Sequence, residues 1–145
     1  MATFDKALLI ACRAHYDQLD RYGAPYILHS VRVMNMVTSE DEKITAILHD
    51  VIEDSPMTIA DLYSEGFEPD IVQAIDCLSK KEGEPYSDYI NRVMKSDLAV
   101  RIKIADLTDN MNMLRTQSEL TEKDFDRYKR YHDAWRKLKK MIDRK

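Results

Sequence analysis

Apolar residues recur at helical spacing along most of the chain. The clearest example follows Ser39, where five residues match the i, i+3, i+4, i+7, i+8 spacing of one helix face: Ile44, Ile47, Leu48, Val51 and Ile52. Ser39 and Glu42 match a capping box, which marks a helix start. We therefore predict one continuous helix that begins near Ser39 and carries the residues up to Asp54.

Residues that start or stop helices divide the rest of the chain into seven more helical segments. The starts are indicated by Ser, Thr or Asp at cap positions and by Pro in a first turn: Thr3, Pro25, Thr58, Pro69, Ser87, Asp97 and Thr121. Gly23 and Gly66 interrupt the pattern, and Lys80 to Pro85 form a polar loop. The expected fold is an all-α, compact helical bundle with short connections.

Composition agrees with this interpretation. The chain has 145 residues, of which 44% are hydrophobic and 33% charged, with only three Gly and four Pro. We expect a single domain over residues 1–145. No apolar run reaches the roughly 18 residues needed to cross a bilayer, and Met1 to Asp5 lacks a secretory signal pattern. Cys12 and Cys77 could pair, but they fit buried free thiols better, so we expect a cytoplasmic protein. The lack of a membrane-spanning run leads us to expect no membrane partner.

The formal net charge of −4 is unevenly distributed. Residues 122–145 hold ten Lys or Arg against five Asp or Glu, a local charge of +5, which leaves −9 for the remainder. The basic helix expected at about residues 122–143 fits a solvated face or a homo-oligomer contact, with a polyanion as the alternative partner. We predict no nucleic-acid partner.

Polar residues lie opposite the apolar stripe of the helix that follows Ser39. At about 100° per residue, His49, Asp50 and Glu53 fall on one side, with Asp54 near its edge. The adjacent imidazole and carboxylate of His49 and Asp50 offer one nitrogen and one oxygen ligand to a divalent cation. The alternative is that both side chains are exposed and bind nothing.

Two other helices carry residues that could complete such a site. His29 lies on the helix that starts at Pro25, and Asp106 shares a face with Lys103 and Asn110 at i, i+3 and i+7 spacing. Together with the adjacent His-Asp pair, His29 and Asp106 would supply two nitrogen and two oxygen ligands. Such a set suits Mn²⁺, Fe²⁺ or Zn²⁺. The alternative role of Asp106 is an ordinary salt bridge.

The order of these residues resembles the H…HD…D signature of the HD phosphohydrolase superfamily. The similarity is greater still to the hydrolase domain of RelA/SpoT proteins and to the small alarmone hydrolases, over about residues 5–116. Three segments carry the resemblance: Ala14-His15 with Gln18, Gly23, Pro25-Tyr26-Ile27 and His29; His49-Asp50-Val51-Ile52-Glu53-Asp54-Ser55; and Ile104-Ala105-Asp106 with Asn110. The resemblance implies an HD-domain fold.

The resemblance also implies a reaction and the residues for it. It implies that one Mn²⁺-like ion is held by four residues: His29, His49, Asp50 and Asp106. Glu53 and Asp54 correspond to the catalytic acidic pair, which could orient water and handle its proton; an exposed helix end is the alternative. The implied substrate is a small phosphorylated nucleotide, guanosine tetra- or pentaphosphate, which loses its 3′-diphosphate. Candidate substrate contacts are Arg21, Tyr26, Lys103 and Asn110.

Several positions depart from the family's pattern. Asp20-Arg21 stands where relatives carry Arg-Lys, and Leu107 stands where they carry Arg. Asp109 replaces a His, and Ser30 replaces a Pro. The loss of positive charge at the first two positions would weaken charge-assisted contacts to a highly anionic nucleotide.

Three functions therefore follow from the sequence. The leading hypothesis is hydrolysis of guanosine 3′,5′-bis(diphosphate) or a related nucleotide, favoured by Glu53 and Asp54. The alternatives are an HD phosphatase for another small phosphorylated metabolite or nucleotide, favoured by Asp20 and Leu107, and a non-catalytic nucleotide-sensing module. Because the chain ends soon after the hydrolase-like region, we expect no synthetase activity.

Overall fold

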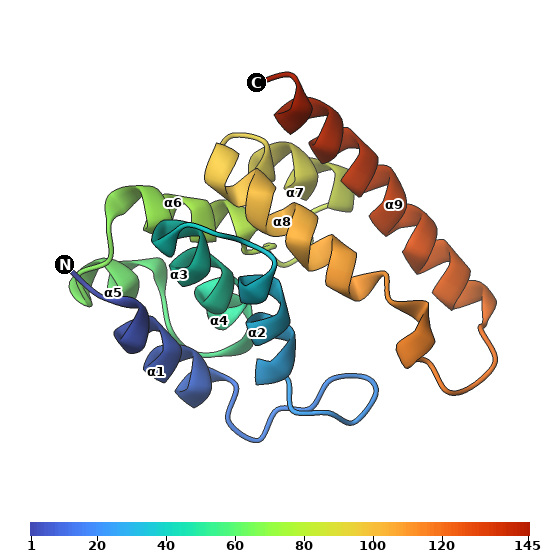
Figure 1. Ribbon diagram of the computed structural model, residues 1–145, viewed down its shortest axis with the longest axis horizontal. Coiled ribbons are helices and arrows are strands. Elements are labelled where there is room, and N and C mark those ends of the chain that lie inside the picture. The colour runs from blue at the N-terminus through green and yellow to red at the C-terminus, as the bar shows by residue number, and fades with distance from the viewer.

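The computed structural model describes all residues, 1–145, and is all-α, as the apolar spacing predicts. It contains nine α-helices and one short 3₁₀ helix (Figure 1). In chain order they are α1 Phe4–Ala14, α2 Ile27–Asn35, α3 Glu40–Leu48, α4 Val51–Asp54, α5 Ile59–Ser64, α6 Pro69–Leu78, α7 Tyr86–Val93, α8 Asp97–Asn110, η1 Met113–Arg115 and α9 Glu122–Asp143.

Most of the predicted helix starts are found close to the expected residues. Three predicted N-cap side chains accept a hydrogen bond from the amide three residues on: Ser39, Thr58 and Thr121. The capping box predicted after Ser39 is only half formed, because the Glu42 side chain does not return a bond. Thr3 makes no side-chain cap bond. The prediction that Ser87 caps a helix was wrong, since Ser87 lies inside α7 and Pro85 occupies the cap position.

The long helix predicted across His49 is interrupted, so the prediction of one continuous helix was also wrong. α3 ends one residue before His49, and Asp50 lies between α3 and α4 at φ −104° and ψ 1°. The His49 amide bonds at 3.4 Å to the carbonyl of Ala46, only three residues back, which tightens the last turn of α3. Apolar spacing does not reveal this break, because Val51 beyond it is as fully buried as Ala46 before it.

Two hydrophobic clusters form the core. One joins α7, α8 and α9 to parts of α2 and α6, and the other joins α1, α3 and α5 to further residues of α6. α8 crosses the middle of the bundle (Figure 1) and is buried around most of its circumference, with Lys103, Asp106 and Asp109 buried as well as Leu107. A helix in this position holds polar groups inside the protein, where they need partners.

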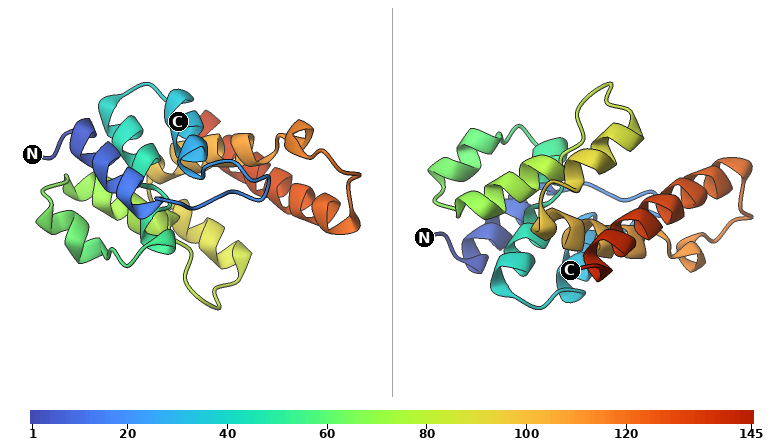
Figure 2. Two further views of the ribbon diagram at one scale, coloured as in Figure 1. Left: turned by 90° about the horizontal axis from the view of Figure 1, so that it is seen from below. Right: turned by 90° about the horizontal axis from the view of Figure 1, so that it is seen from above.

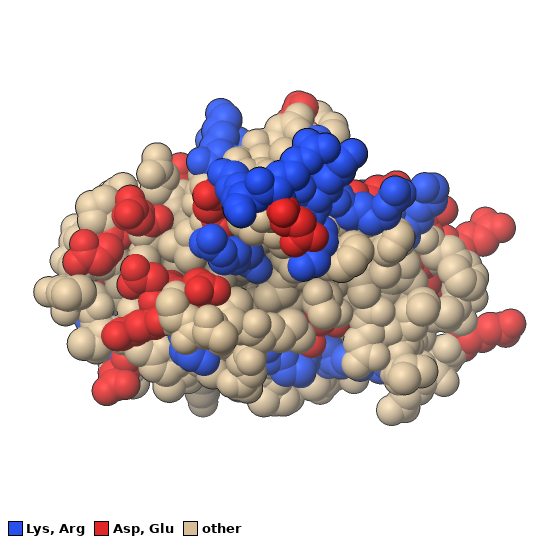
Figure 3. All heavy atoms as spheres, turned by 45° about the horizontal axis from the view of Figure 1, so that its top comes forward, with Lys and Arg blue, Asp and Glu red and all other residues tan.

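The last helix lies along α8 at the outside of the bundle (Figure 2). Ala134 and Leu138 are buried against the first hydrophobic cluster, while basic side chains face outward. Figure 3 shows Lys and Arg gathered over the surface that α9 forms. None of the helices combines the length and apolar character required to cross a bilayer.

Candidate metal centre

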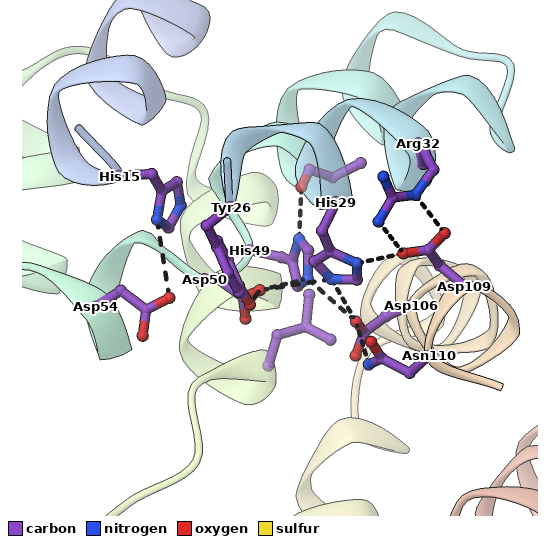
Figure 4. Close-up of polar contacts among 12 residues, drawn as sticks. His15, Tyr26, His29, Arg32, His49, Asp50, Asp54, Asp106, Asp109 and Asn110 are labelled. Atoms are coloured by element: carbon purple, nitrogen blue, oxygen red, sulfur yellow. Dashed lines mark hydrogen bonds and ion pairs between the residues drawn. The ribbon is translucent and has the colours of Figure 1, made fainter. Parts of the chain in front are cut away.

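Four side chains from separate parts of the bundle converge on one point (Figure 4). His29 comes from α2, His49 and Asp50 from the break between α3 and α4, and Asp106 from α8. The Nε2 atom of His29 lies 2.9 Å from Asp106 Oδ1 and 3.7 Å from Asp50 Oδ2. The Nε2 atom of His49 lies 3.1 Å from Asp50 Oδ2 and 3.4 Å from Asp106 Oδ1. His49 and Asp50, consecutive residues at the break, thus contribute an imidazole and a carboxylate to the same point.

The surroundings of His49 indicate that positive charge is needed at this point. Its Nδ1 lies 2.6 Å from the Ala46 carbonyl oxygen, and because a carbonyl only accepts, Nδ1 carries a proton. The buried Nε2 faces the carboxylates of Asp50 and Asp106. On a neutral ring this nitrogen would turn a lone pair toward two carboxylates, so the arrangement requires either a proton on Nε2 or a cation among the three groups. Ligand atoms of His29, His49 and Asp50 within 4.8 Å of one another therefore fit a divalent ion.

The pKa values of His29 and His49 also indicate that positive charge is stabilised at this point. Burial alone would lower the pKa of His29, but hydrogen bonds to Asp106 and Asp109 outweigh burial and raise it to about 9. Burial also opposes the charged form of His49, yet Asp50 and Asp106 raise its pKa well above the ordinary value. The carboxylates thus attract protons when no metal is bound, and a divalent ion would replace those protons.

His29 is oriented by a residue that sequence reasoning treated only as a departure from the family. Asp109 Oδ2 accepts a hydrogen bond from His29 Nδ1 at 2.6 Å, leaving Nε2 free to face the centre. Arg32 donates two further bonds to Asp109, at 2.7 and 3.1 Å. A carboxylate behind an imidazole raises its strength as a metal ligand. The position of Asp109 on α8, three residues after Asp106, was the only sequence signal that it could support His29.

Asp106 is held by two residues that were predicted to contact substrate. Lys103 Nζ lies 2.8 Å from Asp106 Oδ2, and Asn110 Nδ2 donates to Oδ1 at 3.1 Å. Lys103 is only 8% exposed, and its ammonium lies 5.0 Å from the centre of the Tyr89 ring. Lys103 therefore contacts Asp106 from behind and does not line the cavity, whereas Asn110 contacts Asp106 and also lines the cavity.

Tyr26 holds the remaining carboxylate. Its hydroxyl donates to Asp50 Oδ2 at 2.5 Å, and its ring lies between those of His15 and His29, at 5.0 and 5.6 Å between centroids. Burial, followed by the charge of Asp50, raises the pKa of Tyr26 above its ordinary value. The hydroxyl thus remains protonated and acts as a donor.

The predicted acidic pair lies on α4 beside this centre. The Glu53 carboxylate accepts a hydrogen bond from the main-chain amide of Lys80. Asp54 accepts from the Gln18 amide at 3.2 Å, and Gln18 in turn contacts His15 Nδ1 at 2.8 Å. Partial burial and the nearby Asp50 carboxylate raise the pKa of both acids. A raised pKa suits groups that exchange protons near neutral pH.

A cavity of about 300 Å³ opens next to the centre. His29 and Asn110 line it on the side of the four converging residues, and Tyr26 and Arg21 line it along the segment between α1 and α2. Two residues of α9 complete the wall, Arg127 and Tyr131. The last helix therefore contributes to the cavity. For this helix the sequence indicated a solvated face or an oligomer contact, with a polyanion as the alternative partner.

Two of the departures from the family have a structural explanation. The Asp20 carboxylate forms an ion pair with Arg115 and accepts bonds from the amides of Tyr22 and Ala24 at 2.9 and 3.0 Å. Its charge is therefore neutralised within the protein. Leu107 is fully buried in the first hydrophobic cluster and does not line the cavity.

Known proteins similar to this chain include hydrolases of guanosine nucleotides. No family model matches it. It is 32% identical over 121 residues to the guanosine-3′,5′-bis(diphosphate) 3′-pyrophosphohydrolase of Haemophilus influenzae, covering 73% of this chain and 18% of that protein. It is 31% identical over 124 residues to the bifunctional (p)ppGpp synthase/hydrolase SpoT of Escherichia coli, covering 75% and 18%.

The chain thus spans less than a fifth of the length of these relatives. A solved structure of a metazoan orthologue of SpoT, described as hydrolysing ppGpp, superposes with a TM-score of 0.75 at 26% identity. That match covers 99% of this chain and 93% of the other. The chain therefore belongs to the RelA/SpoT-type family of HD-domain hydrolases.

Proposed function

We propose that this protein is a metal-dependent phosphohydrolase that removes the 3′-diphosphate of guanosine 3′,5′-bis(diphosphate) or a closely related nucleotide. The observation that carries the proposal is the convergence of two imidazoles and two carboxylates beside a cavity of about 300 Å³. The names of the relatives and of the similar structure support the same substrate class.

We assign His29, His49, Asp50 and Asp106 as ligands of one divalent cation, Mn²⁺ in the first instance and Fe²⁺ or Zn²⁺ as alternatives. When bound, such an ion acidifies water and offsets negative charge on phosphoryl oxygens. Asp109, Lys103, Asn110 and Tyr26 hold the ligands in place through the hydrogen bonds described above. Asp109 and the Ala46 carbonyl keep the two Nε2 atoms directed at the centre.

We assign Glu53 and Asp54 to proton transfer. Glu53 follows Asp50 by less than one helical turn, and its raised pKa fits a group that takes a proton from the attacking water. Asp54, held by Gln18, is assigned to assist in this step. Both carboxylates lie on the exposed side of α4, where water can reach them.

The charges along the cavity suit a phosphorylated nucleotide. Arg21 is exposed on the wall and has no acidic partner, so we assign it to a substrate phosphate. Arg115 and Arg127 are already paired with Asp20 and Asp124. Since only one arginine on the wall is unpaired, the alternative is an HD phosphatase whose substrate carries fewer phosphates.

A nucleotide panel tests the proposal directly. The purified chain is incubated with Mn²⁺ and guanosine tetraphosphate, guanosine pentaphosphate or plain mononucleotides, and the products are identified. We expect pyrophosphate and the 3′-hydroxyl nucleotide from the first two. Cleavage of a mononucleotide while the tetraphosphate stays intact would favour the alternative substrate, and binding without turnover would indicate a sensing module.

Two variants assign the roles in the same assay. Glu53→Ala should keep its metal and lose most of its turnover, about 10²-fold or more, because it removes the proton acceptor. His49→Ala should lose the metal itself. Glu40→Ala, at an exposed glutamate in the first turn of α3, serves as the matched control. Turnover at the normal rate in Glu53→Ala would dismiss the acidic-pair assignment.

A further inference from the structure

Glu53 is connected to a segment of the chain that the proposed mechanism does not use. Its carboxylate has one hydrogen-bond donor within the protein, the main-chain amide of Lys80. Lys80 lies just after α6, 27 residues along the chain from Glu53. The side chain of Lys80 is exposed and plays no part in this contact.

The segment that presents this amide is fixed by Arg92 of α7. The Arg92 guanidinium donates to the carbonyl oxygens of Asp76 and Ser79, at 2.8 and 2.7 Å, which satisfies acceptors at the C-terminal end of α6. It also forms a two-pronged ion pair with Glu84, at 2.8 and 2.9 Å. Arg92 therefore joins both ends of the segment from residue 79 to residue 84.

A second contact supports the same arrangement. The Tyr89 hydroxyl, also on α7, donates to the carbonyl of Leu78 at 2.8 Å and is buried. The Glu84 side chain in turn accepts from the amide of Lys81 at 3.2 Å. With these bonds in place, the amide of Lys80 is directed at Glu53 and is not free to turn toward solvent.

We propose that Lys80, through its main-chain amide, and Arg92, through the segment it fixes, are positioning residues for Glu53. The inference rests on the proposed role of Glu53 in proton transfer. A main-chain donor limits the rotamers of the carboxylate and favours its ionised form, which is the form that accepts a proton. Neither residue needs to touch the substrate for this effect.

Replacement of Lys80 by proline tests the main-chain amide separately from the side chain. Lys80→Pro removes the N–H, whereas Lys80→Ala removes only the side chain. Ser79 has φ −93° and ψ 105°, a conformation that suits the residue before a proline. We expect kcat of Lys80→Pro to be about tenfold or more below that of Lys80→Ala, since a positioned acid–base group contributes on the order of 10²-fold. Metal content should be the same in both.

A second measurement does not depend on turnover. The carboxyl carbon of Glu53 is followed by NMR as a function of pH in the absence of substrate. Loss of the amide donor should raise the Glu53 pKa in Lys80→Pro, while Lys80→Ala should keep the wild-type titration midpoint. If the wild-type protein hydrolyses no nucleotide, the proposed function fails, but this titration still tests the positioning.

Variants of the Arg92–Glu84 ion pair provide a test if the Lys80→Pro protein does not fold. Arg92→Lys and Glu84→Gln each break the two-pronged contact. Like Lys80→Pro, they should lower kcat and raise the pKa of Glu53. In a Glu53→Gln background, Arg92→Lys should cause no further loss of residual activity. Equal kcat and an equal Glu53 midpoint in Lys80→Pro and Lys80→Ala would overturn the proposal, as would a further loss in the double variant.

Discussion

The two histidines at the centre are each held at the ring nitrogen that faces away from it. Asp109 holds His29, and the Ala46 carbonyl holds His49, both at 2.6 Å. The convergence of the four proposed ligands could be predicted, because metal binding requires particular side chains and these recur in a fixed order. The partner of His29 could not be predicted, because it lies 80 residues further along the chain, where the family's pattern showed only a missing histidine.

Asp109→Asn tests this support at the scale of one residue. The amide keeps the size of the side chain but loses its negative charge, and the Arg32 guanidinium then lacks its ionic partner. We expect metal affinity to fall by about tenfold or more, as is common when the partner of a metal-binding histidine is changed. Competition with a chelator measures the affinity. Asp88→Asn, at an exposed position, is the control, and equal affinity in the two variants would contradict the role of Asp109.

At the scale of elements, apolar spacing predicted the helices but not the break that forms the site. The same periodicity continues through α3 and α4, because both helices bury residues in one cluster. The break depends on the carbonyl of Ala46, which accepts from both the main chain and the side chain of His49. Such a local competition for an acceptor leaves no trace in the spacing of apolar residues.

The segment between α1 and α2 shows a second limit of sequence reasoning. Asp20 appeared to remove positive charge from the substrate site, but its carboxylate instead organises the segment that carries Arg21. It accepts from two amides of that segment and pairs with Arg115, 95 residues away. Charge counted along the sequence does not show which charges are already paired.

Graded substitution of Asp20 tests the role of this segment. Asp20→Asn keeps an acceptor for the two amides but loses the ion pair, and Asp20→Ala loses both. We expect KM to rise in the order wild type, Asn, Ala, by up to about tenfold, since a hydrogen bond to a charged group contributes about 1.5–3 kcal/mol. Metal content should not change. A KM that is identical in all three proteins would show that the segment does not shape the substrate site.

At the scale of the whole molecule, the candidate metal centre lies where the two hydrophobic clusters meet. Asp106 is flanked on α8 by Ala105 and Leu107 of one cluster, and His49 follows Leu48 of the other. The four ligands therefore come together only when the bundle is assembled. The α9 helix adds Arg127 and Tyr131 to the cavity, so the site also extends beyond residues 5–116, the part that resembles the family.

Because the site exists only in the folded protein, metal binding should stabilise the fold. A ligand at a hundredfold excess over its Kd adds about 2.7 kcal/mol to the free energy of unfolding. Thermal unfolding with Mn²⁺ should therefore show a Tm several degrees above that of the chelator-treated protein. His49→Ala should show no such shift. An unchanged Tm of the wild-type protein at saturating Mn²⁺ would argue against a preformed site.

The convergence of four side chains on one divalent ion is tested most directly by anomalous diffraction from a crystal grown with Mn²⁺. We predict a single strong anomalous peak with His29 Nε2, His49 Nε2 and carboxylate oxygens of Asp50 and Asp106 as its protein ligands. A crystal in which these side chains contact only one another, or in which the ion lies elsewhere, would contradict the assignment.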